Sequence, residues 1–157
     1  MTFKTINNGK LKISSEALES FYQYQQDEPS NKEAGGLLLG RYIKNSNDIV
    51  VDKVTIPFER DIRKRYFFCK KDLQHQNIID QEWESSEGTC NYLGEWHTHP
   101  ERNPSPSNFD LEGWRKKIVR DSFDYHSLFF IIVGIEEIKA WEACAIDKSI
   151  NDLEKLV

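Results

Sequence analysis

The sequence predicts a mixed α+β fold, in which a central mixed β-sheet is flanked by helices. Three segments carry apolar residues at three- and four-residue spacing, which is typical of amphipathic helices. They alternate with short apolar runs bounded by polar turns, which is typical of strands. The chain has 157 residues, of which 38% are hydrophobic; this suits one core, so we expect residues 1–157 to form a single domain. Helices alternating with strands around one sheet indicate a layered architecture.

The first half of the chain is expected to form one helix and four strands. The helix follows Ser14 and Ser15, either of which can cap it. Its apolar face is expected to consist of Ala17, Leu18, Phe21 and Tyr22. The expected strands are Leu11–Ile13, Gly35–Ile43, Ile49–Phe58 and Tyr66–Cys69.

The second half is expected to form two helices and three strands. The helices are Lys70 to about Ser86, which Gly88 ends, and Ser107–Arg120. Their inward residues are expected to be Leu73, Ile79 and Trp83 in the first, and Leu111, Trp114 and Ile118 in the second. The strands are Asn91–Thr98, Ser127–Val133 and Ile138–Ile146. The last residues, Asn151–Val157, are expected to form a helical turn.

Composition excludes several classes of protein. The longest apolar run, Leu128–Val133, is far shorter than the ~20 residues of a membrane span, and the amino terminus lacks a secretory signal. We therefore expect a cytoplasmic protein without a membrane partner. The net charge of -5 argues against a nucleic-acid partner. The cysteines Cys69, Cys90 and Cys144 form no CxxC pair, which excludes a cysteine-rich structural zinc site and favours reduced thiols.

The residues able to do chemistry concentrate in the segment GEWHTHPERNPSPSNFD, residues 94–110. His97 and His99 are one residue apart at the end of a strand, so both imidazoles lie on the same face. Pro100 ends that strand, and Asp110 lies at the start of the next helix. Two imidazoles and one carboxylate match a catalytic zinc site, which keeps three protein ligands and a fourth position for water.

Each part of this pattern also has a simpler interpretation. An HxH pair occurs by chance on surface strands, and Ser107-x-x-Asp110 is a helix-capping box. The two interpretations of the box are compatible, because the cap would fix the helix that aims the carboxylate. His75 and His126 fall outside the pattern and are expected to be structural or surface residues.

The combined pattern resembles the H-x-H-x(7)-S-x-x-D signature of the JAMM (JAB1/MPN+) zinc peptidases. The residues that match it are His97, His99, Ser107 and Asp110. The resemblance extends over about Leu11 to Ile146 and implies a cytidine-deaminase-like JAB/MPN fold. The family also carries a glutamate at the start of an early strand, and Glu33, directly before AGGLLLG, occupies that place.

The segments WHTHPE and PSPS are most similar to prokaryotic JAB proteases. Among these, the chain resembles the deconjugating peptidases that accompany bacterial E1- and E2-like enzymes in antiphage, CBASS-type operons. This resemblance implies an isopeptidase whose substrate is a ubiquitin-like modifier or another protein conjugate, with E1- and E2-like operon partners.

The resemblance also implies a role for each residue of the site. Zinc held by His97, His99 and Asp110 would lower the pKa of a bound water toward ~7 and so generate hydroxide. Glu33 would act as general base and then as general acid. Ser107 would donate a hydrogen bond to the oxyanion of the tetrahedral intermediate.

A basic segment, Phe58–Phe68, lies where related peptidases carry an insertion that grips the substrate tail. An extended tail can add to a sheet as a further strand, held by main-chain hydrogen bonds. The charges of this segment can also attract an acidic partner at long range, so we expect Arg63, Lys64 and Arg65 to bind substrate. The alternative is that this charge run is a solvated hairpin.

Three other functions are alternatives to this one. A catalytically silent MPN scaffold is disfavoured because all the metal ligands are present. A zinc nucleoside deaminase requires H-x-E and PCxxC, which the chain lacks. A JAB hydrolase of small molecules or sulfur-carrier adducts stays open.

Overall fold

An eight-stranded mixed sheet forms the centre of the computed structural model, which describes residues 1–121, 123 and 125–157. Its strands are β1 (Thr2–Lys4), β2 (Lys10–Ile13), β3 (Gly35–Tyr42), β4 (Ile49–Val54), β7 (Asn91–Thr98), β8 (Ser127–Val133), β9 (Ile138–Cys144) and β10 (Ile150–Asp152). They are ordered β1-β2-β4-β3-β7-β8-β9-β10. The β2–β4 and β7–β8 pairs are parallel and the others antiparallel, which confirms the predicted fold class.

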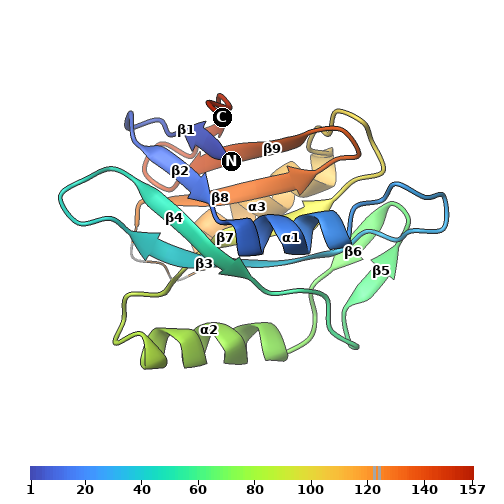
Figure 1. The fold of residues 1–157 in the computed structure, drawn as a ribbon, viewed down its shortest axis with the longest axis horizontal. Coiled ribbons are helices and arrows are strands. Elements are labelled where there is room, and N and C mark those ends of the chain that lie inside the picture. Colours follow the sequence, from blue (N-terminus) through green and yellow to red (C-terminus); the bar gives the residue numbers. More distant parts are fainter. Residues whose placement is uncertain (122, 124) are drawn as a thin grey trace.

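Three helices cover the two faces of this sheet (Figure 1). They are α1 (Ser15–Gln23), α2 (Gln74–Ser85) and α3 (Asn108–Arg120). Phe21 of α1 packs on Trp96 at one face, with ring centroids 5.0 Å apart. Trp114 of α3 stacks on Phe130 at the other face, at 4.7 Å. The helix α2 lies on the same face as α3, because its Ile79 packs on side chains of β3 that point away from α1.

A separate hairpin, β5 (Ile62–Lys64) and β6 (Phe67–Cys69), stands beside the sheet. It approaches β3 closely at Gly35, where a Cβ atom would lie 2.6 Å from the ring of Phe68. Glycine is therefore required there for the hairpin to pack. On its other side, Phe67 contacts Phe109 of α3, with ring centroids 5.6 Å apart.

The predicted inward face of the second helix is largely wrong. The helix begins at Gln74 rather than Lys70, and Leu73 and Trp83 are 71% and 54% exposed. Ile79 is buried as expected, and its buried neighbour on the helix is His75. His75 forms hydrogen bonds at 2.6 Å to both Asp61 and Thr55, so a polar network replaces the expected apolar stripe.

The structure also corrects several expected element boundaries and one expected buried residue. Tyr22 of α1 is 54% exposed, and β4 ends at Val54, three residues before Pro57, which cannot donate to a ladder. The expected helical turn at Asn151–Val157 is wrong: part of this segment belongs to β10, which pairs with β9. The strand β1 was not predicted.

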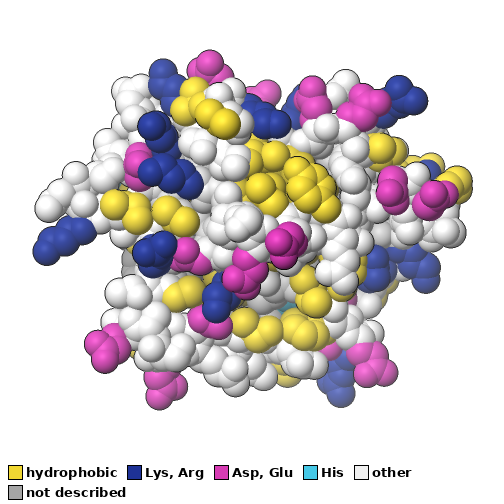
Figure 2. All heavy atoms as spheres, viewed as in Figure 1, with side chains coloured by type: hydrophobic (Ala, Val, Ile, Leu, Met, Phe, Trp, Pro, Cys, Tyr) yellow, Lys and Arg dark blue, Asp and Glu magenta, His cyan; other side chains and the backbone are white. Residues whose placement is uncertain are grey.

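Acidic and basic side chains are interspersed over the face that carries α1 (Figure 2). Within the described residues, no helix is both long and apolar enough to cross a membrane. The three cysteines are free thiols, of which Cys90 and Cys144 are buried.

Candidate metal centre

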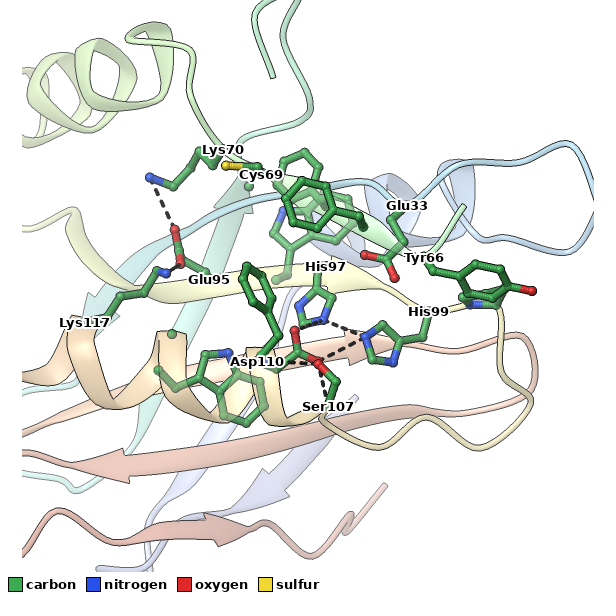
Figure 3. A pocket seen from close by; sticks show the side chains of 18 of the residues that line it. Glu33, Tyr66, Cys69, Lys70, Glu95, His97, His99, Ser107, Asp110 and Lys117 are labelled. Carbon is green, nitrogen blue, oxygen red and sulfur yellow. Dashed lines mark hydrogen bonds and ion pairs between the residues drawn. The ribbon is translucent and has the colours of Figure 1, made fainter. Parts of the chain in front are cut away.

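Two histidines and one aspartate converge at the end of β7 (Figure 3). The Nε2 atoms of His97 and His99 are 2.9 Å apart. Asp110, in the first turn of α3, places Oδ1 3.3 Å from His97 Nε2 and Oδ2 3.2 Å from His99 Nε2. Ligand atoms about 2.0–2.1 Å from a tetrahedral zinc lie roughly 3.3–3.4 Å from one another. The two histidine–aspartate distances are close to this spacing and the histidine–histidine distance is somewhat shorter, so the donor set is compatible with zinc.

Local structure aims each of these side chains. The alternation of β7 puts both imidazoles on one face of the sheet, as the sequence predicted. The capping box is also present: Asp110 N–H donates to Ser107 Oγ, and Ser107 N–H donates to Asp110 Oδ2. Both interpretations of Ser107-x-x-Asp110 are thus compatible with the geometry, because the cap holds the carboxylate beside the histidines.

Glu101 was not identified from the sequence. His99 Nδ1–H donates to its carboxylate at 2.9 Å. This bond keeps a proton on Nδ1 and orients the ring so that Nε2 faces Asp110 and the metal position. The available signal was weak, since an acidic residue two positions after a strand-end histidine is common.

Electrostatics favour a cation between these groups. Burial opposes ionisation of Asp110, but hydrogen bonds from His97 and His99 outweigh it and hold the pKa of that carboxyl well below its usual range. Burial also lowers the pKa of His99, whereas its hydrogen bond to Asp110 and the nearby carboxylates raise it, and the net shift is upward. The aspartate therefore stays ionised and available to a cation near neutral pH.

Glu33 faces the same cavity of about 660 Å³, from the residue before Ala34 and β3. The residue is only 6% exposed. Burial is the main cause that raises the pKa of its carboxyl to about 8; Asp110 and Glu101 add to the rise, and His99 opposes it. Such a carboxyl can both accept and release a proton near neutral pH, as a general base and acid must.

Three backbone contacts hold Glu33 in place. Its N–H donates to the carbonyl oxygen of Lys64 at 2.8 Å, and its own carbonyl oxygen accepts from Arg63 Nε at 2.8 Å. The following residue, Ala34, donates its N–H to Thr98 Oγ1 at 2.9 Å. Thr98 lies between the two histidines and points to the opposite face, so it links the backbone beside Glu33 to the strand that carries them.

The family profile described as prokaryotic homologs of the JAB domain matches residues 14–144 of the chain. The chain belongs to the prokaryotic JAB family. Three relatives, each described as a CD-NTase/cGAS isopeptidase, are similar to it over most of its length. A Pseudomonas aeruginosa protein is 41% identical, over 82% of this chain and 79% of the relative. Proteins of Vibrio cholerae and Escherichia coli are 34% identical, over 85% and 92% of this chain and 82% and 85% of the relatives.

A similar fold is found in a solved structure. The solution structure of a Desulfitobacterium hafniense protein superposes with a TM-score of 0.62, over 93% of this chain and 91% of that one, at 21% identity. That likeness concerns the fold alone. Together with the relatives, the family match identifies the chain as a JAB-type isopeptidase.

The basic residues of the β5–β6 hairpin do not line the cavity, unlike the other expected site residues. Arg63 is directed to the backbone of Glu33, and Arg65 Nη1 donates to the carbonyl oxygen of Pro29 at 2.7 Å. Lys64 is exposed. The hairpin residues that line the cavity are instead 66–70. Substrate binding by Arg63, Lys64 and Arg65 stays a prediction.

Proposed function

We propose that this chain, as one JAB domain over residues 1–157, is a zinc-dependent isopeptidase that works in the cytoplasm. The observation that carries the proposal is the convergence of His97, His99 and Asp110 in one cavity with the buried carboxyl of Glu33. The names of the relatives support a substrate in which a CD-NTase/cGAS-type protein is joined to another protein. We further propose a role in antiphage defence beside E1- and E2-like enzymes.

Each residue has one task in this reaction. His97, His99 and Asp110 would hold the zinc, which when bound acidifies a water molecule and polarises the substrate carbonyl. Glu33 takes a proton from the attacking water while the new carbon–oxygen bond forms. It then passes that proton to the amine nitrogen as the carbon–nitrogen bond breaks. The Oγ of Ser107 accepts its capping bond, so its hydroxyl hydrogen remains to donate to the carbonyl oxygen as negative charge develops there.

The hairpin supports binding of an extended tail. Within the described part of the chain, β6 pairs with β5 alone, so its second edge is open to an added strand beside the cavity. In this proposal Arg63, Lys64 and Arg65 strengthen the grip of the hairpin on the conjugate, and the scissile carbonyl reaches the metal centre.

The test combines metal analysis with cleavage of a purified conjugate. We expect one zinc per chain, and loss of cleavage after chelation that added zinc restores. Glu33→Gln is expected to retain the metal and lose activity by orders of magnitude, because only proton transfer is removed. Glu112→Gln, an exposed change of the same kind on α3, is the control and should cleave normally. Activity that resists chelators in zinc-free protein would overturn the proposal.

A further inference from the structure

The cavity continues from the metal centre as a groove between the hairpin and α3. One wall is the segment Phe67 to Lys70, and the floor includes Glu95 of β7. The other wall is the stripe of α3 formed by Asp110, Gly113 and Lys117, which lie three and seven residues apart on one helical face. Figure 3 shows Glu95 and Lys117 at one end of this groove and the histidines farther along it.

Gly113 is unusual for its position in the wall. Glycine in a helix interior is destabilising relative to alanine. Here the fold does not require it, because a Cβ atom at Gly113 would meet only Lys117 Nζ, at 3.9 Å. The space that a side chain would fill belongs to the groove. A glycine that packing does not demand is explained if the groove must admit another chain.

An unbalanced ion cluster lies at the far end. Glu95 accepts from Lys70 Nζ at 3.3 Å and from Lys117 Nζ at 3.1 Å, so the cluster joins the two walls across the floor. The Glu95 side chain is 15% exposed, and those of the lysines are 32% and 23% exposed. Two ammonium groups share one carboxylate, which leaves one positive charge in excess in a partly desolvated position. Such a position favours an anionic ligand group.

We infer that Gly113 makes room for an extended peptide in this groove, and that Lys70 and Lys117 recognise an acidic side chain of that peptide. The inference rests on the proposed function, because the proposed function places the scissile carbonyl of the substrate at the metal centre. Glu95 precedes His97 by two residues on a strand, and Lys117 follows Asp110 by seven on a helix. These offsets correspond to about 7 to 10 Å, or about two to three residues of an extended chain. The acidic residue therefore lies that far before the residue that bears the scissile carbonyl.

The test measures binding, so that it does not depend on cleavage. The full chain, loaded with zinc, is titrated with fluorescein-labelled peptides of about eight residues that end in a free carboxylate. Their background is alanine and serine, and a single Glu, Gln or Lys is moved through each position. We expect Glu, about two to three residues before the C-terminus, to bind about fivefold tighter than Gln at low salt, and Lys to bind more weakly than Gln. High salt should remove the preference.

Variants assign this preference to residues. Lys117→Gln is expected to abolish it, whereas Lys116→Gln, an exposed neighbour with the same change of charge, should preserve it. Glu95→Gln is expected to strengthen it, because both lysines lose their competing carboxylate. Gly113→Leu should weaken every peptide about tenfold by filling the groove. Its thermal unfolding temperature should not fall, since the added side chain has room and suits a helix.

Two results would overturn the inference: equal affinity for the Glu and Lys peptides at every position, or a preference that Lys117→Gln leaves intact. Unchanged peptide affinity in Gly113→Leu would overturn the role of Gly113. Failure of the proposed function is a separate result, because a protein that selects acidic peptides and cleaves no conjugate would support the groove and reject the isopeptidase.

Discussion

Glu101 contacts the candidate metal centre through His99, because its carboxylate accepts a hydrogen bond from His99 Nδ1–H. Partners of this kind orient a ligating imidazole, and their loss typically reduces metal affinity 10- to 100-fold. We therefore expect Glu101→Ala to weaken zinc binding by about that factor while the fold is retained. Competition with a chromogenic zinc indicator measures the affinity. Glu136→Ala removes an exposed carboxylate that pairs with Arg102, and should leave zinc binding unchanged.

Arg63 was expected to bind substrate, but its position suggests that it holds Glu33 in place. Its guanidinium binds the carbonyl oxygens of Lys32 and Glu33 and lies over the ring of Tyr24. A change here should shift Glu33, the general base in the proposed function, so we expect Arg63→Ala to lower kcat about tenfold for short and long substrates alike, with zinc retained. Steady-state kinetics on both substrates provides the measurement.

Binding of the conjugate by the basic hairpin can be tested with a double variant. If Lys64 and Arg65 hold the conjugate, changing both to Ser should raise KM for the full conjugate more than for a short peptide amide. Equal effects on the two substrates, or none, would show that these charges belong to a solvated hairpin. Arg63 is kept intact in this pair, so that the position of Glu33 does not change.

At the scale of elements, Asp61 joins the hairpin to α2. Its carboxylate accepts from the N–H groups of Phe58, Lys71 and Asp72 and from His75 Nε2. Burial raises the pKa of Asp61, but these hydrogen bonds outweigh it and lower the pKa below the ordinary 3.8. Because the folded chain holds the proton more weakly than the unfolded chain, the ionised carboxylate stabilises the fold above about pH 4. That contribution is lost as pH falls through the folded-state pKa.

Asp61→Asn is accordingly expected to lower the free energy of unfolding by about 2–3 kcal/mol at pH 7, since a buried charged acceptor of several bonds is replaced. The difference from the parent chain should shrink steadily below pH 4. Urea denaturation of metal-free protein at pH 7 and pH 3 tests this. Asp27→Asn, on an exposed loop, should change neither value measurably. A deficit of equal size at both pH values would contradict the argument.

At the scale of the whole molecule, the sequence predicted what local periodicity controls. The alternation of β7 and the cap at Ser107 are local, so the convergence of His97, His99 and Asp110 followed from spacing. The predictions were wrong where contacts between residues distant in sequence determine the structure. Leu73 and Trp83 face outward because His75 is held by Asp61 and Thr55, and β10 forms because β9 offers it an edge. Glu101 lies only two residues from His99, but one acidic residue at that position is a weak signal. Gly113 depends on the hairpin across the groove, a neighbour in space that spacing along the chain does not reveal.

The positions of the site residues along the chain affect the order in which the site forms during folding. His97, His99 and Asp110 fall within fourteen residues, 97 to 110, whereas Glu33 lies 64 residues before His97 and is brought near it by the β3–β7 pairing. Contacts that are close in sequence form sooner during folding than distant ones. A refolding chain should therefore capture zinc before it gains catalytic competence. Stopped-flow refolding with a zinc indicator, sampled in parallel for recovered cleavage, should show two separate phases, with metal uptake as the earlier one.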